Sequence, residues 1–166
     1  MDITVNFDDV TEDAWYAAAV NTLGSMGILN GVGDNKFEPQ RVITRAEFAA
    51  IASRFTEKMV SGFDFVDVTK EHWAYEAIST AAAYGWVNGI GDGLFGPDRS
   101  ITRAEVAKIV NHMLGRLGDQ EQIDDGAGRV FPDVTKSYWA WYEIAEATTD
   151  HDCKFNSDRT EETWKK

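Results

Sequence analysis

Apolar residues recur at helical spacing in four segments of this chain. In residues 73–84 they fall at steps of three and four, the pattern of one buried helix face. Residues 15–26 repeat the pattern, and two further stretches after residues 44 and 102 share it. The predicted buried faces consist of Trp15, Leu23 and Met26; of Phe48, Ile51 and Phe55; of Trp73, Ala77, Ala81 and Tyr84; and of Val106, Ile109, Val110, Met113 and Leu114.

Glycines mark where the first helix of each pair ends. Gly27 and Gly85 each stand at the end of an apolar stripe and are followed by an apolar residue, which suits a helix C-cap. The stretch Asn88–Ser100 then carries glycines and a proline at turn-like spacing, so it should be an ordered loop. The pattern therefore predicts two helix–loop–helix units.

The second helix of each pair starts with the same four residues, Thr-Arg-Ala-Glu. Thr-x-x-Glu is a capping box, in which the hydroxyl and the carboxylate satisfy the first free backbone amides of a helix. The motif predicts that the helices begin at residues 44 and 102. The residues with this structural role are Thr44, Glu47, Thr102 and Glu105.

Capping does not account for the arginine inside each motif, Arg45 or Arg103. A cation at the first helical position is mildly unfavourable, because the free amides there favour an anion. One explanation is an ion pair with an acidic neighbour such as Asp34 or Asp92. The other is a bidentate grip on a ligand carboxylate or phosphate, which suits the planar guanidinium. The sequence leaves both explanations open.

The helix–loop–helix units are copies of one repeat, and a fixed period is read before any single motif. Residues 7–51 align without a gap with residues 65–109, and nearly half of the aligned positions are identical. A third copy opens with the same Asp-Val and Trp spacing and then departs from the pattern. His151 and Phe155 stand where two repeat glycines would recur, and no third Thr-Arg-Ala-Glu appears. We place the repeats at about 6–57, 64–116 and 130–166.

Composition and charge exclude several classes of protein. The chain has 166 residues, 43% of them hydrophobic and 12% aromatic, so it can bury a core, which argues against disorder. Its net charge of −12 argues against nucleic acid or an anionic membrane as a partner. No stretch approaches the ~20 apolar residues of a membrane span. Cys153 is the single cysteine, either a spectator thiol or half of an intermolecular bridge.

Catalytic and metal motifs are missing from the sequence. It contains no nucleophile elbow and no Walker loop, and His72, His112 and His151 share no ligand spacing. The Gly-x-Gly-Asp loops offer one shared aspartate each, too few for a calcium loop of the EF-hand type. We therefore predict no catalytic residues, no metal and no cofactor. A module for protein self-assembly, with a homo-oligomer as its product, is the alternative to a ligand-binding module.

The ordered series Phe-x-Asp-Val, Trp, Gly, Asn-Gly-x-Gly-Asp, Phe-x-Pro and Ile-Thr-Arg-Ala-Glu resembles the S-layer homology (SLH) domain of bacterial envelope proteins. The resemblance covers two full repeats and the first half of a third. It implies a mostly helical module in which three repeats form a pseudo-threefold bundle with grooves between them. Such modules bind secondary cell-wall polysaccharide, or peptidoglycan-linked polymer, often through a pyruvylated sugar whose carboxylate meets the motif arginine.

Roles for individual residues follow from the resemblance. It implies that the motif arginines contact the anion, that Gly31 and Gly89 let the ligand approach the backbone, and that Asp34 and Asp92 belong to the same site. It also implies that three tryptophans, Trp15, Trp73 and Trp139, are mainly core.

The resemblance also predicts organisation and location. We expect residues 1–166 to form one module at the cell wall or cell surface, outside the cytoplasm. Because the chain starts without a signal peptide, we expect it to be a fragment of a larger exported protein. The tail from residue 151 either replaces a helix of the third repeat or leaves a second chain to supply one.

Overall fold

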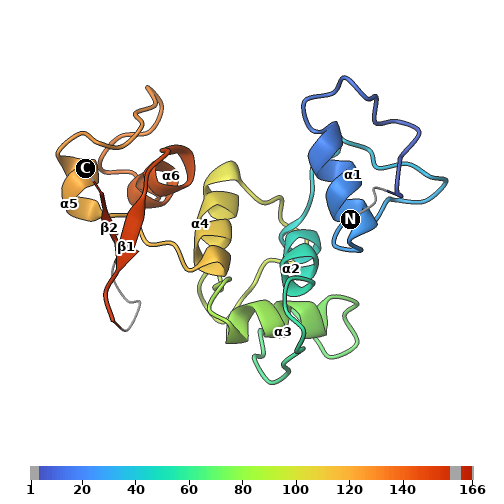
Figure 1. The fold of residues 1–166 in the computed structure, drawn as a ribbon. Helices are drawn as coiled ribbons and strands as arrows, with labels where there is room; N and C mark the ends of the chain where they lie inside the picture. Colours follow the sequence, from blue (N-terminus) through green and yellow to red (C-terminus); the bar gives the residue numbers. More distant parts are fainter. Residues whose placement is uncertain (1–3, 158–161, 166) are drawn as a thin grey trace. The chain divides into compact units, whose positions relative to one another are not determined.

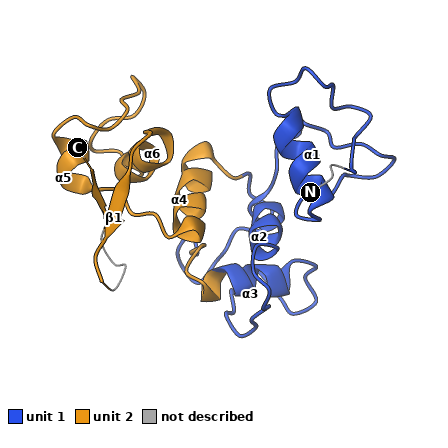
Figure 2. Ribbon diagram, in the orientation of Figure 1, with its two compact units in different colours: residues 1–81, 89–100 blue, residues 82–88, 101–166 orange. Residues whose placement is uncertain are grey.

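The computed structural model describes residues 4–157 and 162–165, and this part of the chain is mostly helical (Figure 1). The chain divides into two compact units (Figure 2). Unit 1 comprises residues 1–81 and 89–100, and unit 2 comprises residues 82–88 and 101–166. The boundary therefore runs through the second repeat. The helices are α1 (Ala17–Ser25), α2 (Arg45–Ser53), α3 (Tyr75–Ala83), α4 (Arg103–Leu114), α5 (Gln120–Asp124) and α6 (Trp141–Thr148), and the strands are β1 (Cys153–Phe155) and β2 (Glu162–Trp164).

The glycine stop after the first helix is confirmed. Gly27 has φ +72°, its amide donates to Gly24, and the Ile28 amide reaches back to the carbonyl of Leu23 at 2.9 Å. This pair of bonds is the Schellman motif, with Ile28 as the buried apolar residue behind the glycine. Gly85 after α3 has the same φ of +72°. A left-handed glycine thus turns the chain from helix into loop in both repeats.

Both predicted capping boxes are present. Thr44 and Thr102 are extended N-cap residues whose hydroxyls accept from the amides of Glu47 and Glu105. In return, each glutamate carboxylate accepts a hydrogen bond from the threonine amide, at 2.8 Å in α2 and 2.9 Å in α4. The helices begin where the motif predicts.

We expect Thr102→Ala to lower the free energy of unfolding by about 1 kcal/mol, because α4 loses its side-chain cap. Thr102→Ser keeps the hydroxyl and should be close to wild type. Urea unfolding followed by circular dichroism measures both variants. Equal losses for alanine and serine would show that the methyl group, rather than the cap, carries the effect.

The buried faces of α2 and α4 differ from the prediction. In α2 the buried side is built from Ala46, Ala49 and Ala52, whereas Phe55 is 51% exposed and Phe48 and Ile51 are half-buried. In α4 Ala104, Ile109 and Asn111 are buried, while Val110 and Leu114 are exposed and Val106 and Met113 are half-buried. Small side chains let a helix backbone approach its neighbours closely, so in α2 the alanine side, and not the bulky side, faces inward. In α4 the burial of Ile109 agrees with the prediction.

The three repeat tryptophans are not core residues, and this expectation was wrong. Trp15, Trp73 and Trp139 are 92%, 66% and 56% exposed. Each lies in the turn two residues before its helix, so it does not share the register of the buried face. The inward position is instead the first helical residue, and Ala17, Tyr75 and Trp141 are all buried there.

The third repeat keeps its first helix, α6, and a hairpin follows this helix. Strands β1 and β2 pair antiparallel, with Cys153 opposite Trp164. Trp164 packs into a small core with Ile123, Trp141 and Ala145, so the hairpin closes over α5 and α6. In its described part, the tail is thus a hairpin that packs on these helices.

Polar contacts join the elements of unit 2. The amide group of Asn111, 1% exposed on α4, donates to the backbone and the carboxylate of Glu143 on α6, both at 2.9 Å. Asp119 caps α5 and accepts a hydrogen bond from the Trp164 amide at 3.0 Å, which fastens β2 to that helix.

Within the described residues, no helix combines the length and the apolar character needed to cross a membrane.

Candidate functional site

The Gly-Asp pair of each repeat loop forms a tight turn. Lys36 bonds back to Gly33, and Leu94 to Gly91, at 2.9 and 2.8 Å. Asp34 and Asp92, with φ of 47° and 51°, take the first turn position, and the residue after each also has a positive φ. Two consecutive positive φ values are typical of a type I′ hairpin turn, which favours Asp, Asn and Gly. The turn therefore explains why aspartate stands at these exposed positions.

Gly31 and Gly89 are explained by close approaches inside the repeat. A Cβ at Gly31 would lie 2.7 Å from the Phe7 ring and would collide with the backbone oxygen of Lys36. A Cβ at Gly89 would lie 2.7 Å from the Leu94 oxygen and 3.1 Å from the Phe65 ring. Packing against a phenylalanine requires these glycines, so a ligand near the backbone is not needed to account for them.

Two aspartates organise the loops, and the sequence reasoning assigned them no role. Asp9 accepts from the amides of Phe37 and Glu38 at 2.8 and 2.7 Å. Asp67 accepts from those of Phe95 and Gly96 at the same distances. The sequence offered one sign of this role, because the same aspartate stands at the corresponding position of both repeats. Each carboxylate ties the start of its repeat to the loop that follows the first helix.

The same bonds affect the acidity of both groups. The amide of Phe37 is the main cause that lowers the pKa of Asp9. Burial acts to raise the pKa of Asp67, but the amides of Phe95 and Gly96 outweigh it, and the net pKa is lowered. A folded pKa below the unfolded value stabilises the protein above the unfolded pKa, and this stabilisation is lost as pH falls through the folded pKa.

We expect Asp67→Ala to destabilise the protein at neutral pH by about 1–2 kcal/mol, because two loop amides lose their acceptor. The difference between this variant and wild type should shrink as pH falls below about 4, where the wild-type carboxylate also becomes protonated. Thermal melts from neutral to acid pH test this, with the exposed Asp98→Ala as the control. A deficit that stays constant down to pH 2 would contradict the assignment.

Arg45 is enclosed by the loop of the second repeat. It is 6% exposed, its Nε donates to the Phe95 carbonyl at 2.9 Å, and its guanidinium lies 4.6 Å from the centre of the Phe95 ring. The first two amides of α2 donate to the carbonyls of Arg99 and Pro97 at 2.9 and 3.0 Å. The loop thus occupies both the arginine and the helix start within unit 1.

Arg103 differs from Arg45. It is exposed, and its side chain forms no hydrogen bond or ion pair with the part of the chain that the structure describes. The reason lies in the repeat: the partner of Arg45, Phe95, belongs to the loop of the next copy, and the copy that follows Arg103 diverges after its first helix. Two arginines at the same repeat position therefore have different surroundings.

Comparison with known proteins identifies the family to which this sequence is related. The family model of the S-layer homology domain matches residues 6–49 and 64–107. The chain is 34% identical over 164 residues to the cellulosome-anchoring protein of Acetivibrio thermocellus and 33% identical over 157 residues to cell surface glycoprotein 1 of the same organism. It is 33% identical over 142 residues to the surface-layer 125 kDa protein of Lysinibacillus sphaericus.

These matches cover most of the chain and little of the relatives. They include 95%, 87% and 84% of this chain but 36%, 7% and 12% of the three relatives. Relatives named as enzymes show the same proportion, since the match to exoglucanase XynX of Acetivibrio thermocellus covers 13% of that protein. The shared part is a module of proteins at the bacterial cell surface. The chain belongs to the S-layer homology domain family.

Proposed function

We propose that this chain anchors an exported protein non-covalently to the bacterial cell wall by binding secondary cell-wall polysaccharide. Family membership and the match to a cellulosome-anchoring protein support anchoring. In this proposal the three repeats form a pseudo-threefold bundle, the polymer lies in grooves between repeats, and the module has no catalytic role. The protein that it anchors would then supply any enzymatic activity.

The exposed arginine at the start of α4 carries the proposal. Arg103 lacks an internal partner in the described chain, so its guanidinium can form a bidentate pair with a ligand carboxylate such as that of a pyruvylated sugar. The positive end of the α4 dipole adds to the attraction for an anion. Arg45 occupies the equivalent position in the repeat, and we assign it first to the packing of the repeat-two loop.

An exposed indole in the same unit suits a saccharide. Trp139 is 56% exposed, and the Lys108 amine of α4 lies 6.0 Å from the centre of its ring. Aromatic side chains with one wet face are common at recognition surfaces, because the ring offers a large contact area and little flexibility. Trp139 and Lys108 therefore support a ligand that combines apolar ring faces with hydroxyl and acidic groups.

Co-sedimentation with purified cell walls tests the proposal. Walls are prepared intact and after chemical removal of the secondary polymer, and the bound fraction is measured at several protein concentrations. We expect saturable binding to intact walls and loss of binding to stripped walls. Equal binding to intact and stripped walls would instead indicate that the protein binds peptidoglycan. Concentration-dependent association of the protein without walls, unaffected by polymer, would favour the self-assembly alternative.

We expect wall binding to depend only modestly on salt. The chain carries a net charge of −12, so an acidic polymer is repelled at long range and attraction must come from one or two local contacts. Raising NaCl from about 0.1 M to about 0.5 M should weaken binding a few-fold, because few contacts are available to screen. A loss over several orders of magnitude would indicate a diffuse electrostatic mechanism.

A further inference from the structure

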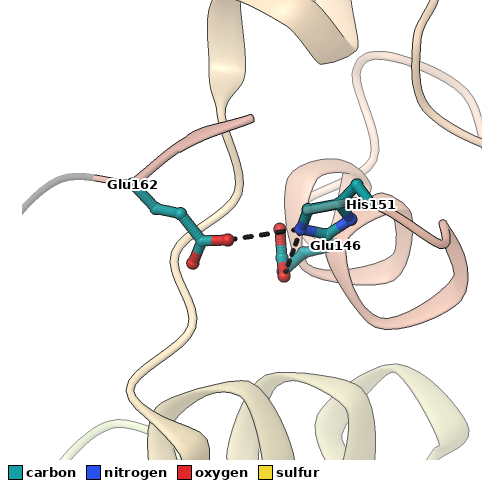
Figure 3. Close-up of side chains that lie close together, drawn as sticks. All are labelled: Glu146, His151 and Glu162. Atoms are coloured by element: carbon teal, nitrogen blue, oxygen red, sulfur yellow. Dashed lines mark hydrogen bonds and ion pairs between the residues drawn. The ribbon is translucent and has the colours of Figure 1, made fainter. Parts of the chain in front are cut away.

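Two glutamates and a histidine meet in the buried part of unit 2 (Figure 3). Glu146 lies on α6 and Glu162 on β2, and both carboxylates have no exposed surface. His151, between these elements in sequence, has a side chain that is 5% exposed. Buried carboxylates are costly unless a cation balances them.

The imidazole is oriented like that of a metal ligand. His151 Nδ1 lies 2.8 Å from the Thr149 carbonyl, which can only accept, so Nδ1 carries a hydrogen. Nε2 then faces Glu146 Oε1 at 3.3 Å and Glu162 Oε1 at 3.2 Å. Trp164 stacks on the ring, with the centroids 4.0 Å apart, and holds this orientation. A backbone carbonyl behind the outer nitrogen is the usual support of a metal-bound histidine.

The spacing of the three donor atoms fits one small ion. All three lie within 4.8 Å of one another. Donors bound at about 2.0–2.1 Å by a tetrahedral ion are about 3.3 Å apart, and the two distances from Nε2 match this value. Among the described residues, Glu146 Oε1 also finds no hydrogen-bond donor, although Glu146 is completely buried.

Arg116 neutralises only part of the buried charge. Its Nε forms an ion pair with Glu146 Oε1 at 2.6 Å, without hydrogen-bond alignment, and its Nη2 lies 3.2 Å from His151 Nε2. Two carboxylates against one guanidinium leave one negative charge. The Arg116 side chain is 34% exposed, so its outer nitrogen can turn to solvent and release Nε2.

We propose that Glu146, His151 and Glu162 form a binding site for Zn²⁺ or a similar divalent transition-metal ion. A set of donors that includes an imidazole nitrogen suits Zn²⁺ and Co²⁺, whereas Ca²⁺ and Mg²⁺ prefer oxygen alone. The ion would join α6 to β2 and so stabilise the packing of the hairpin on this helix. The site is independent of wall binding.

Titration of the metal-free protein with Co²⁺ tests the site, because tetrahedral Co²⁺ absorbs visible light. We expect the visible absorption to saturate at one equivalent and to disappear on addition of Zn²⁺. His151→Gln should bind roughly tenfold or more weakly, while His72→Gln, in unit 1, should bind like wild type.

Melting of the same variants separates binding from folding. Zn²⁺ should raise the melting temperature of wild type and of His72→Gln, since a ligand of the folded state stabilises it, and should raise that of His151→Gln much less. Cobalt bands absent from wild type, together with melting unaffected by Zn²⁺, would overturn the metal site and leave a proton on His151 as the balancing charge.

Discussion

Arg103→Ala should weaken wall binding about ten- to a hundredfold and leave the melting temperature unchanged. The loss corresponds to one charge-assisted contact with the ligand, roughly 1.5–3 kcal/mol. Stability should not change, because the side chain is exposed and has no hydrogen bond or ion pair with the described residues. Co-sedimentation and thermal melts on one protein preparation measure both quantities.

Two further variants sharpen this test. Arg103→Lys should recover only part of the affinity, since an ammonium group cannot form the planar two-pronged contact. Lys70→Ala removes an exposed positive charge in unit 1 and should bind like wild type. Normal wall binding by Arg103→Ala would show that Arg103 does not contact the ligand. An equal loss of affinity in Lys70→Ala would show that the net charge of the protein, and not a specific contact, causes the effect.

Arg45→Ala should destabilise the protein by about 2–4 kcal/mol. The variant leaves the buried Phe95 carbonyl without this donor and removes the guanidinium from the Phe95 ring. A hydrogen bond from a charged group contributes about 1.5–3 kcal/mol, and a cation over an aromatic ring about 0.5–2 kcal/mol. Urea unfolding of Arg45→Ala beside Arg103→Ala provides a matched pair from the two repeats.

The comparison has a clear contrary outcome. If Arg45→Ala unfolds like wild type and loses wall binding to the same extent as Arg103→Ala, then the two arginines act alike. Repeat symmetry would in that case describe the ligand contacts better than the different surroundings of the two side chains do.

Local chemistry explains what could be predicted. The capping boxes at Thr44 and Thr102 and the glycine stop at Gly27 depend on bonds between residues close in sequence. These features can therefore be predicted from the residue types alone, without a structure. The helix–loop–helix order and the family resemblance followed from these signals and from their repetition.

Contacts between distant segments explain what could not be predicted. Arg45 meets a loop 50 residues away, so neither its burial nor its difference from Arg103 follows from the shared motif. The exposure of Trp15 depends on where the helix register starts, because the ring lies just before α1. An apolar stripe does not reveal that the alanine side of α2 packs inward.

The cluster in unit 2 illustrates the same limit. His151 shares no ligand spacing with His72 or His112, so a search for a histidine motif finds nothing. Its partner Glu162 reaches it only because the tail folds back as a hairpin over α6. A site assembled by such a divergent segment has no repeat copy to reveal it.

Titration with soluble, purified secondary cell-wall polymer tests the central claim most directly. Calorimetry compares the intact polymer with the same polymer after mild acid has removed its carboxylate-bearing ketal groups. The account predicts saturable binding of the intact polymer and binding roughly tenfold or more weaker after the treatment, in line with the loss of a charge-assisted contact. Absence of binding to the intact polymer would contradict the anchoring function, and equal affinity for both polymers would contradict recognition of the carboxylate.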